Sequence, residues 1–293
     1  MPFATVGEVL AHYLSEKKDK AIAFDRLCFA AQALGPFFAD LAPEEITRAK
    51  SREYAEYRRR KVSLQTVRKE LSVLDTALKF ADGAGRLRGA FNVVLPKKAG
   101  PRDVYLSRQE LRDLLRVSAP HLRRFILISW FMGRRRSAVL ALRWTPGRDG
   151  GWVDLQRARI HFLAEGDGES RKGKGSAPIP APLQRLLRRW RREDAASGQT
   201  CVVHFRGKPV ASVRKSLEAA ARRAGLESRR VTPHVLKHTA VTRFFQLGGL
   251  PADGEDFFAT SQETLMKVYR KHHPSFARRG AEIMGRVRRP SGD

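Results

Sequence analysis

The chain has 293 residues, 42% of them hydrophobic, and a formal net charge of +27 at pH 7. This length allows two folded domains, and the apolar fraction excludes a disordered chain. Two cysteines, Cys28 and Cys201, exclude a disulfide framework and a four-cysteine zinc site, while the charge surplus predicts a polyanionic partner, most simply nucleic acid.

The first third of the chain predicts helices throughout. The expected helical stretches are residues 3–17, 23–38, 41–61 and 63–87, and Gly83 and Gly85 are expected to end the last helix. Within the third stretch, Pro43 and the two glutamates that follow it predict a helix start. Residues 92–107 then combine proline, glycine and basic residues without periodicity, as a linker does. We therefore expect a helical domain over 1–98, a linker over 99–104 and a second domain over 105–293.

The second part predicts a mixed domain. Ser107 and Glu110 have the spacing of a capping box, and residues 121–133 form a mostly apolar, buried helix. Residues 151–180 predict two short strands, a glycine-rich turn and a third strand, and helices follow over 182–194 and 213–226. The expected fold class is mainly α, with an all-helical N-terminal domain and an α+β C-terminal domain that contains a small antiparallel sheet.

The first segment with chemical potential is GRRRSAVLALRW, residues 133–144. It places three consecutive arginines between a buried helix and a second apolar stretch. Solubility alone explains many such runs, but an arginine held between apolar helices suits the bidentate grip of a phosphate. A second segment, ESRKGKGSAPIP at 169–180, carries lysines on a glycine-flexed hairpin tip. Such lysines are usually solvated, although a partly desolvated one can transfer a proton.

The third segment is TPHVLKHT, residues 232–239, in which Thr232 suits an N-cap and Pro233 the first helical position. His234, Lys237 and His238 then fall at i, i+3 and i+4 on one helix face. A zinc pair is the alternative, but no catalytic glutamate stands between the histidines and no third ligand lies nearby.

The fourth segment, ETLMKVYRKHHP at 263–274, sets Tyr269 among arginine, lysine and histidine residues. This electropositive setting favours a phenolate and attracts a phosphodiester. Together the four segments supply a nucleophilic hydroxyl, a proton donor and phosphate-binding cations. The sequence shows no carboxylate cluster of the kind that a two-metal nuclease requires. The combination predicts phosphoryl transfer through a tyrosyl intermediate, with no metal and no cofactor.

The order and spacing of these segments resemble the tyrosine recombinases, or phage-type integrases, over essentially the whole chain. The likeness is closest to integrases of mobile elements that lack a separate arm-site-binding domain. It implies the tyrosine-recombinase fold, with a SAM-like core-binding domain that clamps DNA, followed by the catalytic domain. It also implies the catalytic set, which is Arg135, Lys172, His234, Lys237 and Tyr269. Lys174 is the second choice for the hairpin lysine, since only Lys172 stands eight residues before Pro180.

Two departures from the family pattern accompany this assignment. Lys237 stands where the family has its second arginine, which replaces a rigid fork by a point charge. Thr260 stands in FFATSQETL where relatives commonly have histidine, tryptophan or methionine after leucine-glycine. Its hydroxyl is a possible donor to a phosphate oxygen. Further expected contributors are His238 as a supporting residue and, as DNA contacts, Arg134, Arg136, Arg188 and Arg189.

The resemblance implies a bacterial cytoplasmic protein, associated with the nucleoid, whose partner is double-stranded DNA. Strand exchange between two duplexes with two sites each implies a homotetramer on DNA, and an excisionase or another DNA-bending protein is an expected accessory factor. No membrane partner is expected. Two alternatives stay open: a DNA-binding relative of the same fold without effective cleavage, and a type IB topoisomerase-like enzyme that relaxes DNA by the same chemistry.

Overall fold

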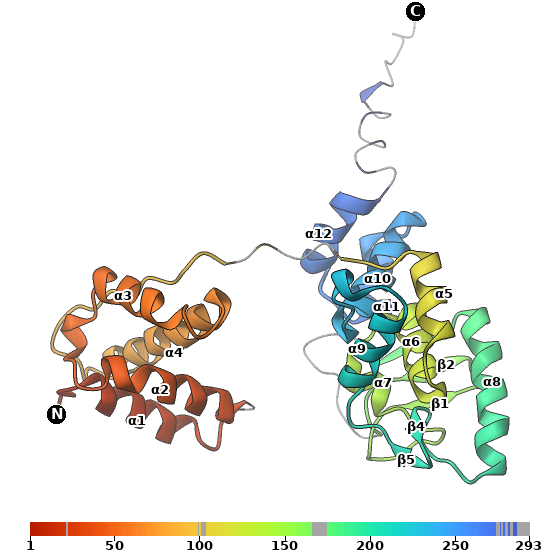
Figure 1. The fold of residues 1–293 in the computed structure, drawn as a ribbon, viewed down its shortest axis with the longest axis horizontal. Coiled ribbons are helices and arrows are strands. Elements are labelled where there is room, and N and C mark those ends of the chain that lie inside the picture. The colour runs from red at the N-terminus through yellow and green to blue at the C-terminus, as the bar shows by residue number, and fades with distance from the viewer. Residues whose placement is uncertain are drawn as a thin grey trace, which may run out of the picture. The chain divides into compact units, whose positions relative to one another are not determined.

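The computed structural model describes the chain except for residues 22, 99, 101–103, 166–174, 274–275, 277, 279–280, 282–283 and 286–293. It divides into two compact units, Met1–Arg102 and Asp103–Asp293 (Figure 1). No helix in the described part of the chain is long and apolar enough to cross a bilayer.

The first unit is helical. Its elements are α1 (Val6–Lys17), α2 (Phe24–Phe38), the 3₁₀ turn η1 (Pro43–Glu45), α3 (Arg48–Arg58) and α4 (Leu64–Gly83). The apolar faces of α1, α2 and α4 pack on one another (Figure 1) and form one core with Tyr54 of α3. The Tyr54 hydroxyl also donates a hydrogen bond to the buried Glu70 carboxylate at 2.7 Å, and Arg58 forms an ion pair with the same carboxylate at 3.0 Å. The buried Glu70 carboxylate therefore has both a hydrogen-bond donor and a cation as partners.

The expected helix over residues 41–61 begins later than its sequence suggests. Pro43 and Glu45 form only the 3₁₀ turn η1, and α3 begins at Arg48. Thr47 is the N-cap of α3, because its hydroxyl accepts a hydrogen bond from the amide of Lys50 at 3.3 Å. Glu45 accepts instead from the amide of Ala42, so the acidic residues cap the short turn and a threonine caps the helix.

The second unit contains two small antiparallel sheets among helices. Its helices are α5 (Arg108–Arg116), α6 (Pro120–Met132), α7 (Arg136–Leu140), α8 (Ala181–Ala196), α9 (Arg214–Arg223), η2 (Glu227–Arg229), α10 (Pro233–Gln246), α11 (Pro251–Phe258) and α12 (Gln262–His272). Its strands are β1 (Trp152–Asp154), β2 (Arg159–His161), β3 (Ser176–Pro178), β4 (His204–Phe205) and β5 (Lys208–Pro209). The first sheet has the order β1-β2-β3, with Val153 opposite Ile160 and Ile160 opposite Ala177, and the second pairs β4 with β5. The expected mainly α chain with a small antiparallel sheet is confirmed.

Two predicted helix starts are also confirmed. Ser107 and Glu110 form a capping box at the start of α5, where the amide of Glu110 donates to the Ser107 hydroxyl at 3.1 Å. Thr232 caps α10 by accepting from the amide of Val235 at 3.3 Å, and Pro233 occupies the first helical position. Both signals are local in sequence, and each satisfies an amide that has no partner inside its helix.

Gly133 brings α6, α10 and α11 together. It ends α6 with φ +56°, a conformation that favours glycine. A Cβ at this position would lie 2.5 Å from the Phe258 ring of α11 and 3.1 Å from Ala240 of α10. Glycine is therefore required both for the backbone conformation and for the close approach. This junction positions the arginines that follow it.

A candidate anion-binding pocket

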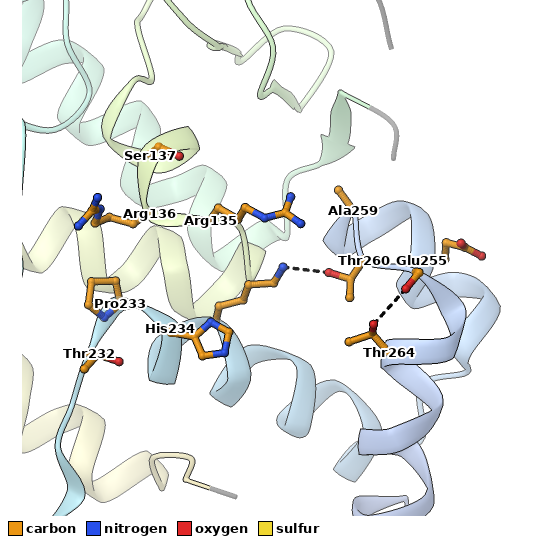
Figure 2. A pocket seen from close by; sticks show the side chains of 12 residues that line it. Arg135, Arg136, Ser137, Thr232, Pro233, His234, Glu255, Ala259, Thr260 and Thr264 are labelled. Atoms are coloured by element: carbon orange, nitrogen blue, oxygen red, sulfur yellow. Dashed lines mark hydrogen bonds between the residues drawn. The ribbon is translucent and has the colours of Figure 1, made fainter. Parts of the chain in front are cut away.

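Five of the predicted site residues, Arg135, Arg136, His234, Lys237 and Thr260, line one cavity of about 790 Å³ in the second unit. Arg135 enters it from the loop before α7, His234 and Lys237 from the first turns of α10, and Thr260 from the segment after α11 (Figure 2). The lining set is Arg135, Arg136, Ser137, Thr232, Pro233, His234, Lys237, Glu255, Ala259, Thr260, Ser261 and Thr264. The cavity is thus rich in cationic and hydroxyl groups from three stretches of the sequence, residues 135–137, 232–237 and 255–264.

The two arginines of the pocket diverge. Both Arg135 and Arg136 are exposed, and Arg135 points toward Ala259 and Thr260 while Arg136 points the opposite way (Figure 2). Arg135 therefore faces the centre of the cavity, where its guanidinium can make two parallel hydrogen bonds to a phosphate. Arg136 lies at the rim, on the side of Pro233.

Lys237 is held by Thr260, the second residue beyond the end of α11. Its Nζ donates a hydrogen bond to the Thr260 hydroxyl at 2.9 Å (Figure 2). This hydroxyl donates in turn to the carbonyl oxygen of Phe258 at 3.2 Å. Because the Thr260 proton is directed at its own backbone, Thr260 acts on the pocket through Lys237 and not as a donor into the cavity. Burial, and then the charges of Arg135 and Arg134, lower the pKa of Lys237 to about 8.

Ala259, which lines the pocket beside Thr260, has a left-handed backbone with φ +47°. An L-residue with a Cβ is strained there, whereas glycine is not. We predict that Ala259→Gly raises the free energy of unfolding by about 1 kcal/mol, measured by urea denaturation. The control is Ala219→Gly in the interior of α9, which should lower it by about 1 kcal/mol. A loss of stability in Ala259→Gly comparable to that of the control would contradict this assignment.

His234 and His238 have different surroundings. His234 is exposed and lines the pocket in the first turn of α10. His238 is half-buried and does not line it, and its Nδ1 lies 3.3 Å from the hydroxyl of the buried Thr242 one turn further along α10. This arrangement suits a residue that supports the helix. No group of three or more metal-ligating side chains occurs among the described residues.

Tyr269 lies on the inner face of α12 and does not line the pocket. Its ring centroid is 5.3 Å from that of Phe245 on α10, 4.5 Å from that of His273 and 5.8 Å from that of Phe276. Phe245 is eight residues beyond Lys237, which is roughly 12 Å along an α-helix. In this conformation the Tyr269 ring therefore packs about two turns of α10 away from Lys237.

Arg134 differs from what we expected of a DNA contact. Its side chain is only 4% exposed, so it is buried and cannot contact a duplex in this conformation. The turn at Gly133 directs it inward, where its guanidinium carbon lies 4.6 Å from the centroid of the Phe162 ring. The expectation that Arg134 contacts DNA or solvent is therefore wrong for this structure.

Two further predicted residues that the structure describes lie away from the pocket. Arg188 and Arg189 are exposed on α8, where Arg189 pairs with Glu193 at 3.5 Å, and neither lines the cavity. Lys172 and Lys174 lie outside the described residues. Ser137 and Thr264 also line the pocket but were not predicted to do so. Both lie within the segments that the sequence singles out, Ser137 in GRRRSAVLALRW and Thr264 in ETLMKVYRKHHP. Small hydroxyl residues carry no signal that separates pocket positions from ordinary helix positions.

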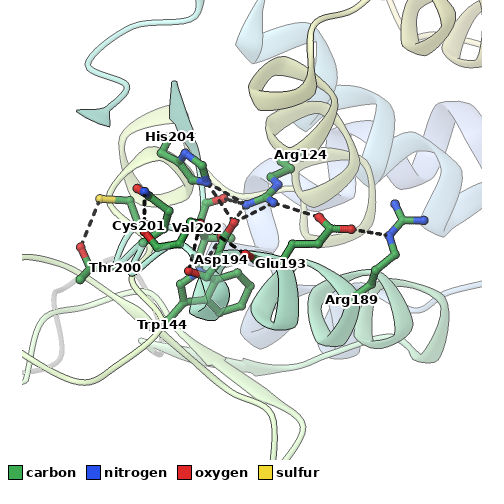
Figure 3. Close-up of polar contacts among 11 residues, drawn as sticks. Arg124, Trp144, Arg189, Glu193, Asp194, Thr200, Cys201, Val202 and His204 are labelled. Atoms are coloured by element: carbon green, nitrogen blue, oxygen red, sulfur yellow. Dashed lines mark hydrogen bonds and ion pairs between the residues drawn. The ribbon is translucent and has the colours of Figure 1, made fainter. Parts of the chain in front are cut away.

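A second polar cluster surrounds Asp194 of α8 and has a structural role (Figure 3). Its carboxylate is 2% exposed and accepts hydrogen bonds from Arg124 at 2.6 and 2.9 Å, and from the indole N–H of Trp144 at 2.8 Å. The Nε2 of His204 lies 3.1 Å from the same carboxylate. Burial by itself would raise the pKa of Asp194, but the bonds from Arg124, His204 and Trp144 outweigh it and hold the pKa below the ordinary value of 3.8.

This cluster predicts a stability effect separate from the pocket. Asp194→Asn should lower the free energy of unfolding by about 2 kcal/mol, because hydrogen bonds to a charged group are lost in a buried site. The wild-type contribution is full above the ordinary pKa and is lost as the pH falls through the lowered one. Urea denaturation at several pH values measures both effects, with the exposed Glu193→Gln as control. Equal stability of Asp194→Asn and wild type at neutral pH would refute the assignment.

Solved structures show which proteins share this fold. A Tn1549 transposon integrase in complex with transposon right end DNA superposes with a TM-score of 0.76 at 15% identity, covering 96% of this chain and 98% of that one. The same integrase with a circular intermediate DNA gives 0.77 at 14% identity, covering 96% and 100%. A lambda integrase dimer bound to a COC' core site gives 0.69 at 14% identity, covering 90% and 95%. No protein-family model and no curated protein matches the sequence. The chain therefore has the fold of these transposon and phage integrases, which is the tyrosine-recombinase fold.

Proposed function

We propose that the protein is a site-specific DNA recombinase, or integrase, that cuts and rejoins DNA strands through a 3′-phosphotyrosyl intermediate. The proposal rests on one observation: Arg135, His234 and Lys237 line the same pocket. Arginine and lysine around a cavity of this kind favour an anion, and the net charge of +27 favours a polyanionic one. The fold is one that the transposon and lambda integrases use in complexes with DNA.

The reaction follows from the chemistry of the residues. The Tyr269 oxygen attacks the scissile phosphorus, its proton passes to the imidazole of His234, and the bond from phosphorus to the 5′ oxygen breaks. Arg135 and Lys237 neutralise the non-bridging oxygens, on which negative charge builds up in the transition state. His234 positions the phosphate and relays protons, and Lys172 protonates the departing 5′ oxygen. A free 5′ hydroxyl reverses these steps, so one phosphodiester replaces another.

The packing of Tyr269 adds a requirement to this reaction. Because its ring lies against Phe245 and outside the pocket lining, the nucleophile reaches the phosphate only if the segment around α12 repositions. The alternative is a relative that binds DNA without effective cleavage, which the position of Tyr269 outside the pocket lining favours. We expect repositioning to accompany binding of the duplex, with the first unit as the second half of a DNA clamp.

The assembly that we propose is a tetramer of this chain on two duplexes. Each duplex carries two cleavage sites, and each site needs one tyrosine. We further propose that it acts in the bacterial cytoplasm on nucleoid DNA, together with an excisionase or another DNA-bending accessory protein.

The experiment that tests the function begins with a binding site. Selection of duplexes from a random-sequence pool gives the preferred DNA, and a nicked version of the selected duplex traps a covalent adduct because the cleaved fragment diffuses away. A recombinase is expected to give the adduct and, from two intact duplexes, resolved crossover products. Adduct and plasmid relaxation without crossover would indicate a topoisomerase-like enzyme, and tight binding without adduct would indicate a DNA-binding relative.

A further inference from the structure

The GRRR segment contains one arginine that does not line the pocket. Arg134 is 4% exposed, whereas Arg135 and Arg136 beside it are exposed and line the cavity. The difference arises at Gly133, whose left-handed backbone and contact with Phe258 turn the next residue inward. A buried guanidinium has a cost in free energy that a methionine of similar length would avoid. We therefore expect the buried Arg134 guanidinium to make interactions that offset this cost.

Arg134 connects the first sheet to the end of α11. Its guanidinium lies over the Phe162 ring, next to β2, and its Nη2 donates to the carbonyl oxygen of Asp256 at 3.2 Å. Asp256 belongs to the last turn of α11, whose carbonyl groups have no partners inside the helix and carry the negative end of the helix dipole. A cation at this place both satisfies a carbonyl and stabilises the helix end.

The end of α11 is linked to Lys237 through the hydrogen bond to Thr260. After Phe258 the chain turns at Ala259 and presents the Thr260 hydroxyl, which accepts the hydrogen bond from Lys237. Arg134 therefore reaches the pocket through one short segment. It also acts through its charge: burial and the neighbouring Arg135 lower its pKa to about 10, so it remains protonated at neutral pH, and its charge is one cause of the lowered pKa of Lys237.

We propose that Arg134 is a positioning residue for phosphoryl transfer: an internal cation that holds the last turn of α11, so that Thr260 keeps the Lys237 ammonium in the pocket, and that adds positive potential behind the bound phosphate. This inference rests on the proposed function for its catalytic consequence. Its structural part concerns Lys237 alone and can be measured without DNA cleavage.

The first test is the titration of Lys237, followed by NMR of its side chain in the folded full-length protein. Arg134→Met removes the charge and the bond to Asp256 but keeps an apolar side chain over Phe162, and it should raise the Lys237 pKa above about 8. Arg134→Lys keeps the charge and should leave the pKa low. Arg136→Met, which removes an exposed arginine from the same segment, should not move it. The other charged or titratable groups that face the pocket or lie next to Lys237 on α10 are Arg135, His234, His238 and Glu255.

The second test is the rate of adduct formation on the nicked duplex at saturating DNA. Arg134→Met should lower this rate by up to about 100-fold through misplacement of Lys237, with little change in DNA affinity. Arg134→Lys should recover most of the loss, and Arg136→Met should weaken binding instead. Arg134→Gln, which keeps a donor for the Asp256 carbonyl, replaces the methionine variant if that variant does not fold.

The outcomes separate the inference from the function on which it rests. If the neutral variants leave both the Lys237 pKa and the saturating rate at wild-type values, or lower only the melting temperature, Arg134 is a packing residue and the inference is wrong. If wild type forms no adduct on its selected duplex, the proposed function fails. The titration of Lys237 still decides whether Arg134 sets the state of the pocket.

Discussion

We expect replacement of Tyr269 with phenylalanine to abolish covalent adduct formation on the nicked duplex and to leave DNA affinity unchanged. Only the phenolic oxygen is removed, and the ring that packs on Phe245 and His273 is retained, so the fold should be intact. The measurement compares the amount of protein–DNA adduct on denaturing gels with affinity from a binding titration. Because we propose no other hydroxyl as the nucleophile, this substitution should lower the rate of adduct formation more than any other.

The control for this experiment is Tyr57→Phe, which removes a phenol from an exposed position in the first unit. It should form adduct at the wild-type rate. An undiminished adduct in Tyr269→Phe would mean that another residue is the nucleophile. A loss of DNA binding in that variant would show that the phenol has a structural role and would leave the nucleophile to be identified by mapping.

The second large effect is expected at Lys237. Lys237→Ala should lower the rate of adduct formation by roughly 10²–10³-fold, the usual cost of losing one donor to a developing oxyanion. Lys237→Arg should preserve or raise the rate, since it keeps the charge and adds a bidentate grip. Lys215→Ala on the exposed side of α9 is the matched control and should match wild type. A large loss in Lys237→Arg would mean that the pocket is built for lysine, through its bond to Thr260.

The same residue predicts a pH dependence. In the free protein the protonated fraction of Lys237 falls as the pH rises through about 8. At subsaturating DNA the rate of adduct formation should therefore decrease above this pH in wild type. In Lys237→Arg the decrease should move to higher pH, because arginine stays protonated. A decrease at the same pH in both proteins would assign it to another group.

Local signals were enough to predict much of the fold. The capping box of Ser107 and Glu110 and the N-cap at Thr232 involve residues three apart, and the structure has both. The acidic turn at Pro43 misled for a physical reason: proline and glutamate also suit a 3₁₀ turn, and only the cap at Thr47 decides where α3 begins.

The site was predictable in part for the same reason. His234 and Lys237 share a helix face at fixed spacing, and both line the pocket. The burial of Arg134 could not be foreseen, because three identical residues stand in a row. Which of them turns inward depends on Phe162 and Asp256, which approach from distant segments. Two features depend in the same way on tertiary packing: the bond between Lys237 and Thr260, and the Tyr269 ring against Phe245.

The most direct test of the central claim is to identify the residue that becomes joined to DNA. Wild-type protein trapped on the nicked duplex is digested with protease and nuclease, and the linked peptide is sequenced by mass spectrometry. We expect a single peptide that contains Tyr269 esterified to a 3′ phosphate, with a free 5′ hydroxyl on the released strand. A linkage to any other residue, a 5′ phosphate linkage or cleavage without a protein adduct would contradict it.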